Sequence, residues 1–266
     1  MNLLRKDFAP IGSAAWDEIN TIAKETLKAN LSARRFADVE GPYGINFAAV
    51  NLGRLKISDN KSPKDVVYGV NTVLPLVEAR INFSLDIWEL DNIDRGAKDI
   101  ALDDLAEAAR KMADFEENAV YNGFKDSGIV GLNQVAAKNR INMTLDKDNL
   151  VDAISEAQGR MRKEGIASGA NLVVNPALWQ FLAHVVPGGT LGDTVRRQIK
   201  GDIIYSETVD GALLVADREG DVELTTGQDF AIGYHSHDAS KVNLFLTESF
   251  TFRVITPEAV IGFSLK

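Results

Sequence analysis

The chain has 266 residues, 45% of them hydrophobic, which is enough to bury a sizeable core in one or two domains. Its 29 basic and 38 acidic residues give a net charge of −9, which argues against nucleic-acid binding, because that requires clustered Lys and Arg. The absence of cysteine, of a membrane-length apolar run and of a signal-peptide pattern predicts a cytoplasmic protein that contacts no membrane.

The first part of the chain predicts an amphipathic helix and then a long hairpin. Ser13 is a candidate N-cap for a helix whose apolar stripe runs from Trp16 to Leu31. The polar segment 59–64 has the composition of a hairpin tip, so 51–74 is expected to form a two-stranded arm. Because an isolated hairpin is marginally stable in water, this arm should pack against another surface.

Helices and strands alternate in the rest of the chain. The most regular helical pattern covers 103–122 and ends at Gly123, and a second helix is expected over 148–164. Asn175 and Pro176 form an N-cap and N1 pair after a strand at 171–174. Further strands are expected at 203–205, 212–216, 222–224, 242–247 and 250–255. This order predicts an α+β protein of two interleaved domains.

Motifs for chemistry are nearly absent. The chain has no phosphate-binding loop, no zinc-protease motif and no nucleophile elbow. His235 and His237 could begin a metal site, but no third ligand accompanies them, and a polar loop after Tyr234 is the preferred interpretation. The glycine-rich segment 188–192 follows a helix and is interpreted as a loop. No catalytic or metal-binding residue is assigned.

A run of carboxylates surrounds Trp88. Paired carboxylates can act as acid and base, but no nucleophile or histidine lies near this run in the sequence. Arg80 and Arg95 offer nearby counter-charges, so an ion-pair cluster is the preferred interpretation. The carboxylates are Asp86, Glu89, Asp91 and Asp94.

Four segments together carry a family resemblance. They read FAPIGSAAWDEI, RRFADVEGPYG, LPLVEARINFSLDIWELDNIDRG and TGQDFAIGYHSHD, and the likeness continues in order from Leu3 to the strands within 248–265. The chain resembles the encapsulins, shell proteins of bacterial and archaeal nanocompartments that are related to tailed-phage major capsid proteins. The resemblance implies the Hong Kong 97-type fold, with a peripheral domain, an axial domain and an extended arm. It implies peripheral segments at 1–50, 75–130 and 224–266, the arm at 51–74 and the axial domain at 131–223.

The resemblance also implies a function. The chain would be a non-enzymatic subunit of a closed icosahedral homo-oligomer, with sixty copies as the expected size, in a cytoplasmic nanocompartment. Cargo such as a ferritin-like protein or a dye-decolorising peroxidase would bind through a terminal targeting peptide. A viral or prophage capsid protein is one alternative, and a flavin- or metal-dependent enzyme is another. The direct start with an amphipathic helix favours the encapsulin interpretation, because phage capsid subunits commonly begin with a scaffolding or processed segment.

Three sets of residues match functional positions of the family. Pro187, Gly188, Gly189 and Thr190 would line a pore at a symmetry axis. Trp88 would stack on a flavin, FMN or riboflavin, with Arg80 as a donor to its polar edge. The cargo-peptide groove would comprise Leu27, Leu31, Arg34, Asp38, Ile232 and Tyr234.

Overall fold

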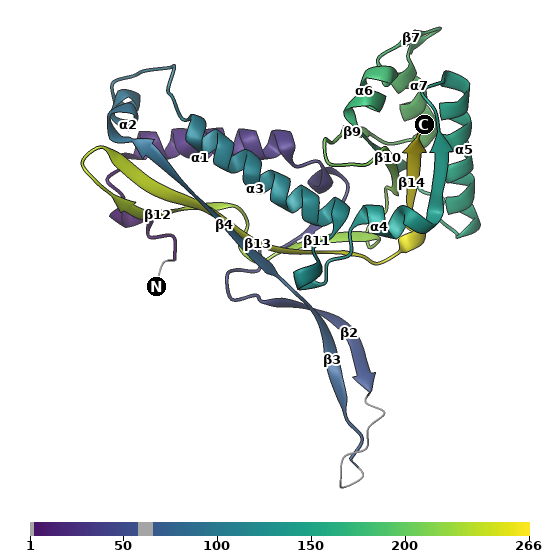
Figure 1. Cartoon of the computed structure of the whole chain (residues 1–266), viewed down its shortest axis with the longest axis horizontal. Coiled ribbons are helices and arrows are strands. Elements are labelled where there is room, and N and C mark those ends of the chain that lie inside the picture. Colours follow the sequence, from purple (N-terminus) through teal and green to yellow (C-terminus); the bar gives the residue numbers. More distant parts are fainter. Residues whose placement is uncertain (1–2, 58–65) are drawn as a thin grey trace.

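The computed structural model describes residues 3–57 and 66–266 and shows two packed regions, each of helices and a sheet, with a protruding arm (Figure 1). The helices are α1 Ser13–Asn30, α2 Ile87–Asp94, α3 Asp103–Asn122, α4 Leu132–Ala136, α5 Lys147–Lys163, α6 Pro176–Leu182 and α7 Leu191–Ile199. The strands are β1 Asp38–Glu40, β2 Ala49–Ile57, β3 Gly69–Pro75, β4 Val77–Asp86, β5 Arg140–Met143, β6 Ala170–Val174, β7 Val185–Val186, β8 Gly189–Thr190, β9 Ile203–Tyr205, β10 Ala212–Ala216, β11 Val222–Thr226, β12 Ala231–His237, β13 Lys241–Val254 and β14 Val260–Leu265. The protein is therefore of the α+β class.

The first sheet is built on the long strand β13. Strand β13 pairs antiparallel with β4, β12 and β11, and β1 joins the outer edge of β11 in parallel. Helices α1 and α3 lie side by side against this sheet (Figure 1). Their buried residues recur every three or four positions, as in Leu105, Ala109 and Met112, which gives each helix one apolar face toward the sheet.

The second sheet has the order β5-β14-β10-β6-β9 and carries α5, α6 and α7. Strands β6 and β10 are buried along their whole length, as expected for the centre of a sheet covered by helices. The C-terminal strand β14 pairs with β10 and β5, so residues 260–265 lie in this sheet and not with β13. The predicted segment 224–266 is thus divided between the two sheets, while the other domain boundaries stay a prediction.

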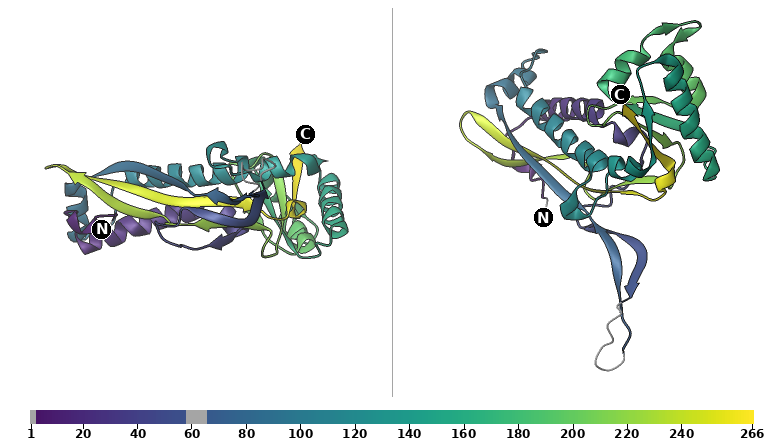
Figure 2. Two further views of the ribbon diagram at one scale, coloured as in Figure 1. Left: turned by 90° about the horizontal axis from the view of Figure 1, so that it is seen from below. Right: turned by 45° about the vertical axis from the view of Figure 1, so that its right-hand side comes forward.

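The two sheets share a third group of buried side chains. The end of α3 supplies Val120 and Tyr121, which pack with Leu213 of β10 and with Phe250 and Phe252 of β13. The edge-on view shows the two regions side by side in a thin slab (Figure 2). Because the core is continuous across the junction, the two regions hold a fixed relation to each other.

Strands β2 and β3 form the arm, a two-stranded ribbon that extends away from both sheets (Figures 1 and 2). Its outer part exposes apolar side chains: Leu55 is 57% exposed, Ile57 63% and Val70 62%. The arm predicted at 51–74 is present, whereas the predicted tip at 59–64 lies outside the described residues. The exposed ribbon has the character of a surface that a partner covers.

Several sequence predictions of the elements are confirmed and others are wrong. Helix α3 has the predicted bounds, and Gly123 ends it with a φ of +85°. Ser13 is not the N-cap of α1: it is the first helical residue, and the Gly12 carbonyl accepts the bond from Trp16 at 3.0 Å. The strands expected at 242–247 and 250–255 are one strand, because Glu248 and the residue after it continue the pairing with β4.

Candidate functional site

A groove of about 790 Å3 opens between the C-terminal half of α1 and the start of β12. We call it the α1–β12 groove. A volume of this size is typical of a ligand site. Its floor is apolar and consists of Ala23, Leu27, Leu31, Phe230, Ile232 and Leu246.

The groove floor follows from the periodicity of two elements. Leu27 and Leu31 lie one helical turn apart, and the Leu31 amide still donates to the Leu27 carbonyl at 2.9 Å. Leu27 and Leu31 are each 7% exposed and Ile232 is 3% exposed. These side chains therefore serve two purposes: one side packs in the core of the first sheet, and the other side forms the groove floor.

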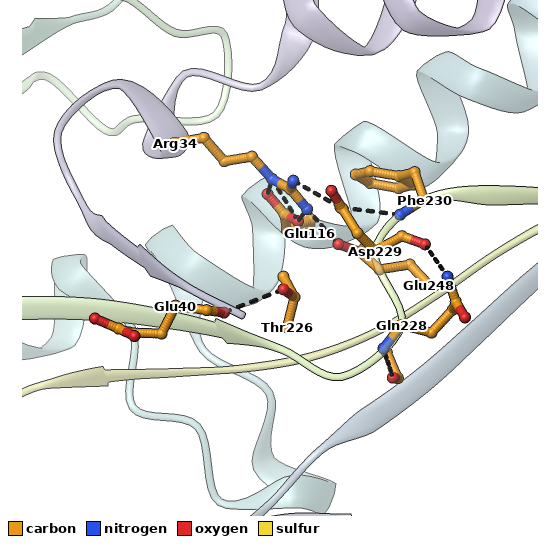
Figure 3. Close-up of polar contacts among 9 residues, drawn as sticks. Arg34, Glu40, Glu116, Thr226, Gln228, Asp229, Phe230 and Glu248 are labelled. Atoms are coloured by element: carbon orange, nitrogen blue, oxygen red, sulfur yellow. Dashed lines mark hydrogen bonds and ion pairs between the residues drawn. The ribbon is translucent and has the colours of Figure 1, made fainter. Parts of the chain in front are cut away.

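Arg34 stands at one end of the groove on the short 3-10 turn Ala33–Arg35, where three carboxylates converge on it (Figure 3). Its Nε donates to Glu116 at 2.9 Å, and its Nη1 donates to Asp229 at 2.9 Å. Its Nη2 donates to Glu116 at 2.6 Å and also to Glu248. The guanidinium also lies over the Phe230 ring, 4.8 Å from its centroid. One cation thus joins α3, β13 and the segment before β12.

This cluster places more negative than positive charge in the interior. Glu116 and Glu248 are fully buried, whereas the Asp229 side chain is 47% exposed. Burial raises the pKa of Glu248 well above its usual range, and the neighbouring Glu116 raises it further, against the opposing effect of Arg34. Burial alone would lower the pKa of Arg34, but its carboxylate partners hold that pKa above its ordinary value. Burial thus shifts Glu248 toward its protonated form, while Arg34 stays charged.

Glu117, next to Glu116 on α3, holds the same turn from the other side. Its carboxylate accepts hydrogen bonds from the Ser32 hydroxyl and, at 2.8 Å, from the Ala33 amide. The Ser32 hydroxyl lies 2.7 Å from that of buried Tyr121. Burial raises the pKa of Glu117 to about 7, although the Ala33 and Ser32 hydrogen bonds work in the opposite direction. Two consecutive glutamates thus fix the chain where it leaves α1.

Four of the six residues predicted for the cargo groove meet in it: Leu27, Leu31, Arg34 and Ile232. Asp38 and Tyr234 do not line it. Asp38 instead accepts a hydrogen bond from the Gly220 amide at 2.7 Å. The Tyr234 hydroxyl lies 2.6 Å from Nδ1 of His237, beyond the groove on β12. The role of all six residues in cargo binding stays a prediction.

The predicted pore residues form a tight hairpin. Pro187 and Gly188 connect β7 to β8, and Gly188 and Gly189 have φ values of +91° and +139°, which favour glycine. Thr190 is the N-cap of α7 and accepts a hydrogen bond from the Asp193 amide at 3.1 Å. Val185, on the same hairpin, is 87% exposed. The local geometry explains the glycines, and the pore role stays a prediction.

Trp88 and Arg80 do not face each other in one chain. The Arg80 guanidinium lies 4.2 Å from the Phe245 ring centroid, whereas Trp88, 68% exposed, has Arg95 over its ring at 5.7 Å. Asp86, at the strand end, lies six positions after Arg80 on β4, a length of about 20 Å. Each of the two side chains thus contacts a different neighbour within the chain, and flavin binding stays a prediction.

The other polar patterns have structural roles. Within the carboxylate run, Asp86 caps α2 by accepting from the Trp88 amide at 2.8 Å, and Asp91 lies 3.6 Å from Arg95. The histidine segment belongs to β12 and is a strand instead of the expected loop. In residues 3–57 and 66–266, no group of His, Cys, Asp and Glu has the arrangement of a metal site. Over the same residues, no helix has the length and apolar character needed to cross a membrane.

The sequence interpretation missed the carboxylates of the Arg34 cluster, although both buried glutamates leave a signal. Glu116 occupies the position four residues after Met112 on the buried stripe of α3, where an apolar residue is expected. Glu248 alternates with Leu246 and Phe250 on the buried face of β13. Asp229 leaves no comparable signal, because it is half-exposed and precedes a strand.

Comparisons with known proteins agree on one family. Residues 1–251 match the family described as encapsulating protein for peroxidase. The type 1 encapsulin shell protein of Rhodospirillum rubrum is 39% identical over 268 residues, which cover 98% of this chain and 96% of that protein.

Solved structures establish the fold. The virus-like particle from Pyrococcus furiosus matches with a TM-score of 0.63 at 16% identity, over 92% of this chain and 97% of that one. A chain of Microbacterium phage Oxtober96 matches with a TM-score of 0.61 at 13% identity, over 89% and 91%. The protein thus has the tailed-phage capsid fold of the Hong Kong 97 type, but its sequence is far closer to shell proteins than to phage capsids. The relatives at more than 30% identity are named shell proteins, which points to a structural protein and not an enzyme, and the chain belongs to the encapsulin shell protein family.

Proposed function

We propose that this chain assembles with copies of itself into a closed cytoplasmic shell and holds cargo enzymes by binding an extended tail in the α1–β12 groove. The observation that carries the cargo proposal is the preformed groove of about 790 Å3 with an apolar floor. A tail with a few aliphatic residues could bury them against Leu27, Leu31 and Ile232. The description of the matched family supports a peroxidase as the first cargo to test.

A single tail is expected to bind modestly. A short groove that buries a few aliphatic side chains supports an affinity of about 1 μM, or about −8 kcal/mol. Many identical grooves on one shell would face an oligomeric cargo enzyme, and the second contact then forms within the same assembly. Retention of cargo therefore does not require a tight individual site.

Groove-filling substitutions test the cargo proposal. Charges at Leu27 or Ile232 would also be buried in the core and would destabilise the fold. Asn20→Trp with Ala231→Trp fills the groove from two lining positions that retain exposed surface. Glu25→Trp with His235→Trp introduces the same two tryptophans at exposed positions of α1 and β12 that do not line the groove.

The assay is co-expression with a fluorescent reporter protein that carries an aliphatic tail, followed by measurement of reporter per shell subunit in purified particles. We expect the groove-filled shells to assemble without reporter and the control shells to load normally. Equal loading of both variants would place the cargo site elsewhere.

The arm carries the assembly proposal. Its exposed apolar side chains would be covered by a neighbouring copy, and contacts between different surfaces of identical subunits can close into a shell. Leu55→Asp with Val70→Asp should leave the subunit folded but prevent particle formation. Asn51→Asp with Asn71→Asp adds the same charge to the same ribbon without removing apolar surface. Electron microscopy and size-exclusion chromatography distinguish the outcomes, and normal particles from the Leu55/Val70 variant would refute this role.

A further inference from the structure

The α1–β12 groove has a charge opposite to that of the protein as a whole. The chain carries a net charge of −9, yet five basic side chains border the groove. One acidic side chain, Asp229, is among the described residues that line it. The basic side chains are Lys6, Lys24, Lys28, Arg34 and Arg35. A ligand of this groove therefore meets an apolar floor within a positive rim.

The two charges at the end of the groove are already engaged with each other. Arg34 donates to Asp229 and to two buried glutamates, so its guanidinium has little capacity left for a ligand. Asp229 is bonded to Arg34 and also accepts from the Phe230 amide at 2.9 Å. Of the two charged residues predicted for the cargo groove, Arg34 is bonded to these carboxylates and Asp38 lies outside the groove. Arg34 is thus a positioning residue of the groove wall.

The rim cations, in contrast, are free. Lys24, Lys28 and Arg35 are exposed, and none of the three forms an ion pair with any residue that the structure describes. Lys24 and Lys28 lie one turn apart on α1, so both charges stand along the same side of the groove. Lys6 lies with its Nζ 5.1 Å from the Trp16 ring centroid.

We propose that the α1–β12 groove selects a peptide tail whose aliphatic anchors are flanked by acidic side chains, with Lys24, Lys28 and Arg35 as the charge-selective residues. This inference rests on the proposed cargo-binding function and specifies the chemistry of its partner. The recessed apolar floor favours a peptide over a nucleic acid, because aliphatic side chains fill it and phosphates do not. The selectivity is carried by exposed cations, so it weakens as salt is raised.

The expected size of the effect follows from the exposure of the rim. An exposed ion pair changes an affinity about twofold, so three pairs change it about eightfold. A tail with basic flanks would lose a similar factor through repulsion. Charge at the rim therefore decides between tails that share the same aliphatic anchors.

Three designed tails on the fluorescent reporter test this inference. They share aliphatic anchors at alternate positions, and their intervening positions are all Glu, all Ser or all Lys. Each tail is co-expressed with the full chain at limiting reporter, and reporter per shell subunit is measured. We expect the Glu tail to load about eightfold more than the Ser tail and the Lys tail to load least.

The charge-reversed shell Lys24→Glu with Lys28→Glu should reverse this order. Lys147→Glu with Lys163→Glu, on α5, changes the net charge equally and should preserve it. If the three tails load equally and the groove-filled shell loads none of them, the charge selectivity is refuted, whereas the groove remains the cargo site. No loading of any tail would overturn both. A nucleic acid could instead occupy the groove. In that case wild-type particles would contain nucleic acid, the charge-reversed shell would lack it, and tail loading would rise after nuclease treatment. This result would overturn the inference.

Discussion

Glu117→Gln is predicted to stabilise the protein at alkaline pH. Glu117 is buried between α3 and the turn after α1, with no basic group bonded to it among the described residues. Glutamine keeps the shape of the side chain, and its carbonyl oxygen can still accept from the Ala33 amide at 2.8 Å. The Ser32 hydroxyl can accept from the new amide group and donate to Tyr121. The substitution therefore removes a buried charge while the Ala33 amide and the Ser32 hydroxyl keep their partners. The Ser206 hydroxyl, 3.4 Å from the same carboxylate, would accept from the new amide group instead of donating.

The direction of the pH dependence follows from the raised pKa. The Glu117 carboxyl has a pKa of about 7 in the folded chain against an ordinary value of 4.5. Between these two values the folded state binds a proton more tightly than the unfolded state, so stability falls as pH rises. At 1.36 kcal/mol per pKa unit, ionisation of Glu117 costs about 3 kcal/mol above the upper value. The glutamine variant does not incur this cost.

Thermal melting of the full chain at one protein concentration measures the effect. Below the lower pKa value the melting temperatures of variant and wild type should change with pH in parallel. At about pH 8.5 the variant should have gained about 6–10 °C relative to the wild type. Glu248 and the other titrating groups are common to both proteins, so they cancel in the difference. A difference in melting temperature that does not change with pH would refute the reasoning.

Three further predictions concern other parts of the fold. Arg34→Met leaves two buried glutamates without their counter-charge and should cost about 3–5 kcal/mol, seen as a large drop in melting temperature, whereas Arg80→Met at an exposed position should change it little. Gly211→Ala should destabilise the protein by more than Gly220→Ala. Both glycines have a positive φ, but the Cβ added at 211 would lie 2.3 Å from a backbone oxygen, whereas the Cβ added at 220 would meet open space. Val185→Trp adds bulk to the β7–β8 hairpin at a residue whose own φ is not positive, so particles should still form while substrate entry to an enclosed enzyme slows. Unchanged turnover of the enclosed enzyme would contradict the pore role.

Local patterns in the sequence predicted the elements well. The stripe from Leu105 to Val120 and the glycine after it predicted α3 with its observed bounds. Asn175 before Pro176 predicted the start of α6, where the Asn175 side chain accepts from the Leu178 amide at 2.9 Å. Signals of this kind depend on near neighbours in the chain, which is why a single sequence carries them.

The local sequence patterns did not predict which distant strands pair or which distant charges compensate each other. Glu248 stands in the middle of β13, between the two strands expected at 242–247 and 250–255. In the structure it is buried, because Arg34, far away in the sequence, supplies a counter-charge. Likewise, the pairing of β14 with β10 follows from how the two regions pack, and nothing within 260–265 specifies it. A buried charge can be interpreted only when its partner is known.

The buried charges also bear on how the groove binds. Glu116 and Glu117 are consecutive on α3, and together they hold Arg34, Ser32 and Ala33. Leu31, part of the groove floor, immediately precedes that turn, so the wall of the groove is fixed by bonds to the longest helix. A wall that is already ordered loses little conformational freedom when a tail binds, and the ordering cost then falls on the tail alone. Under the cargo proposal, this preorganisation would let a short tail with few anchors bind, with the buried cluster setting the groove's shape and the exposed rim its selectivity.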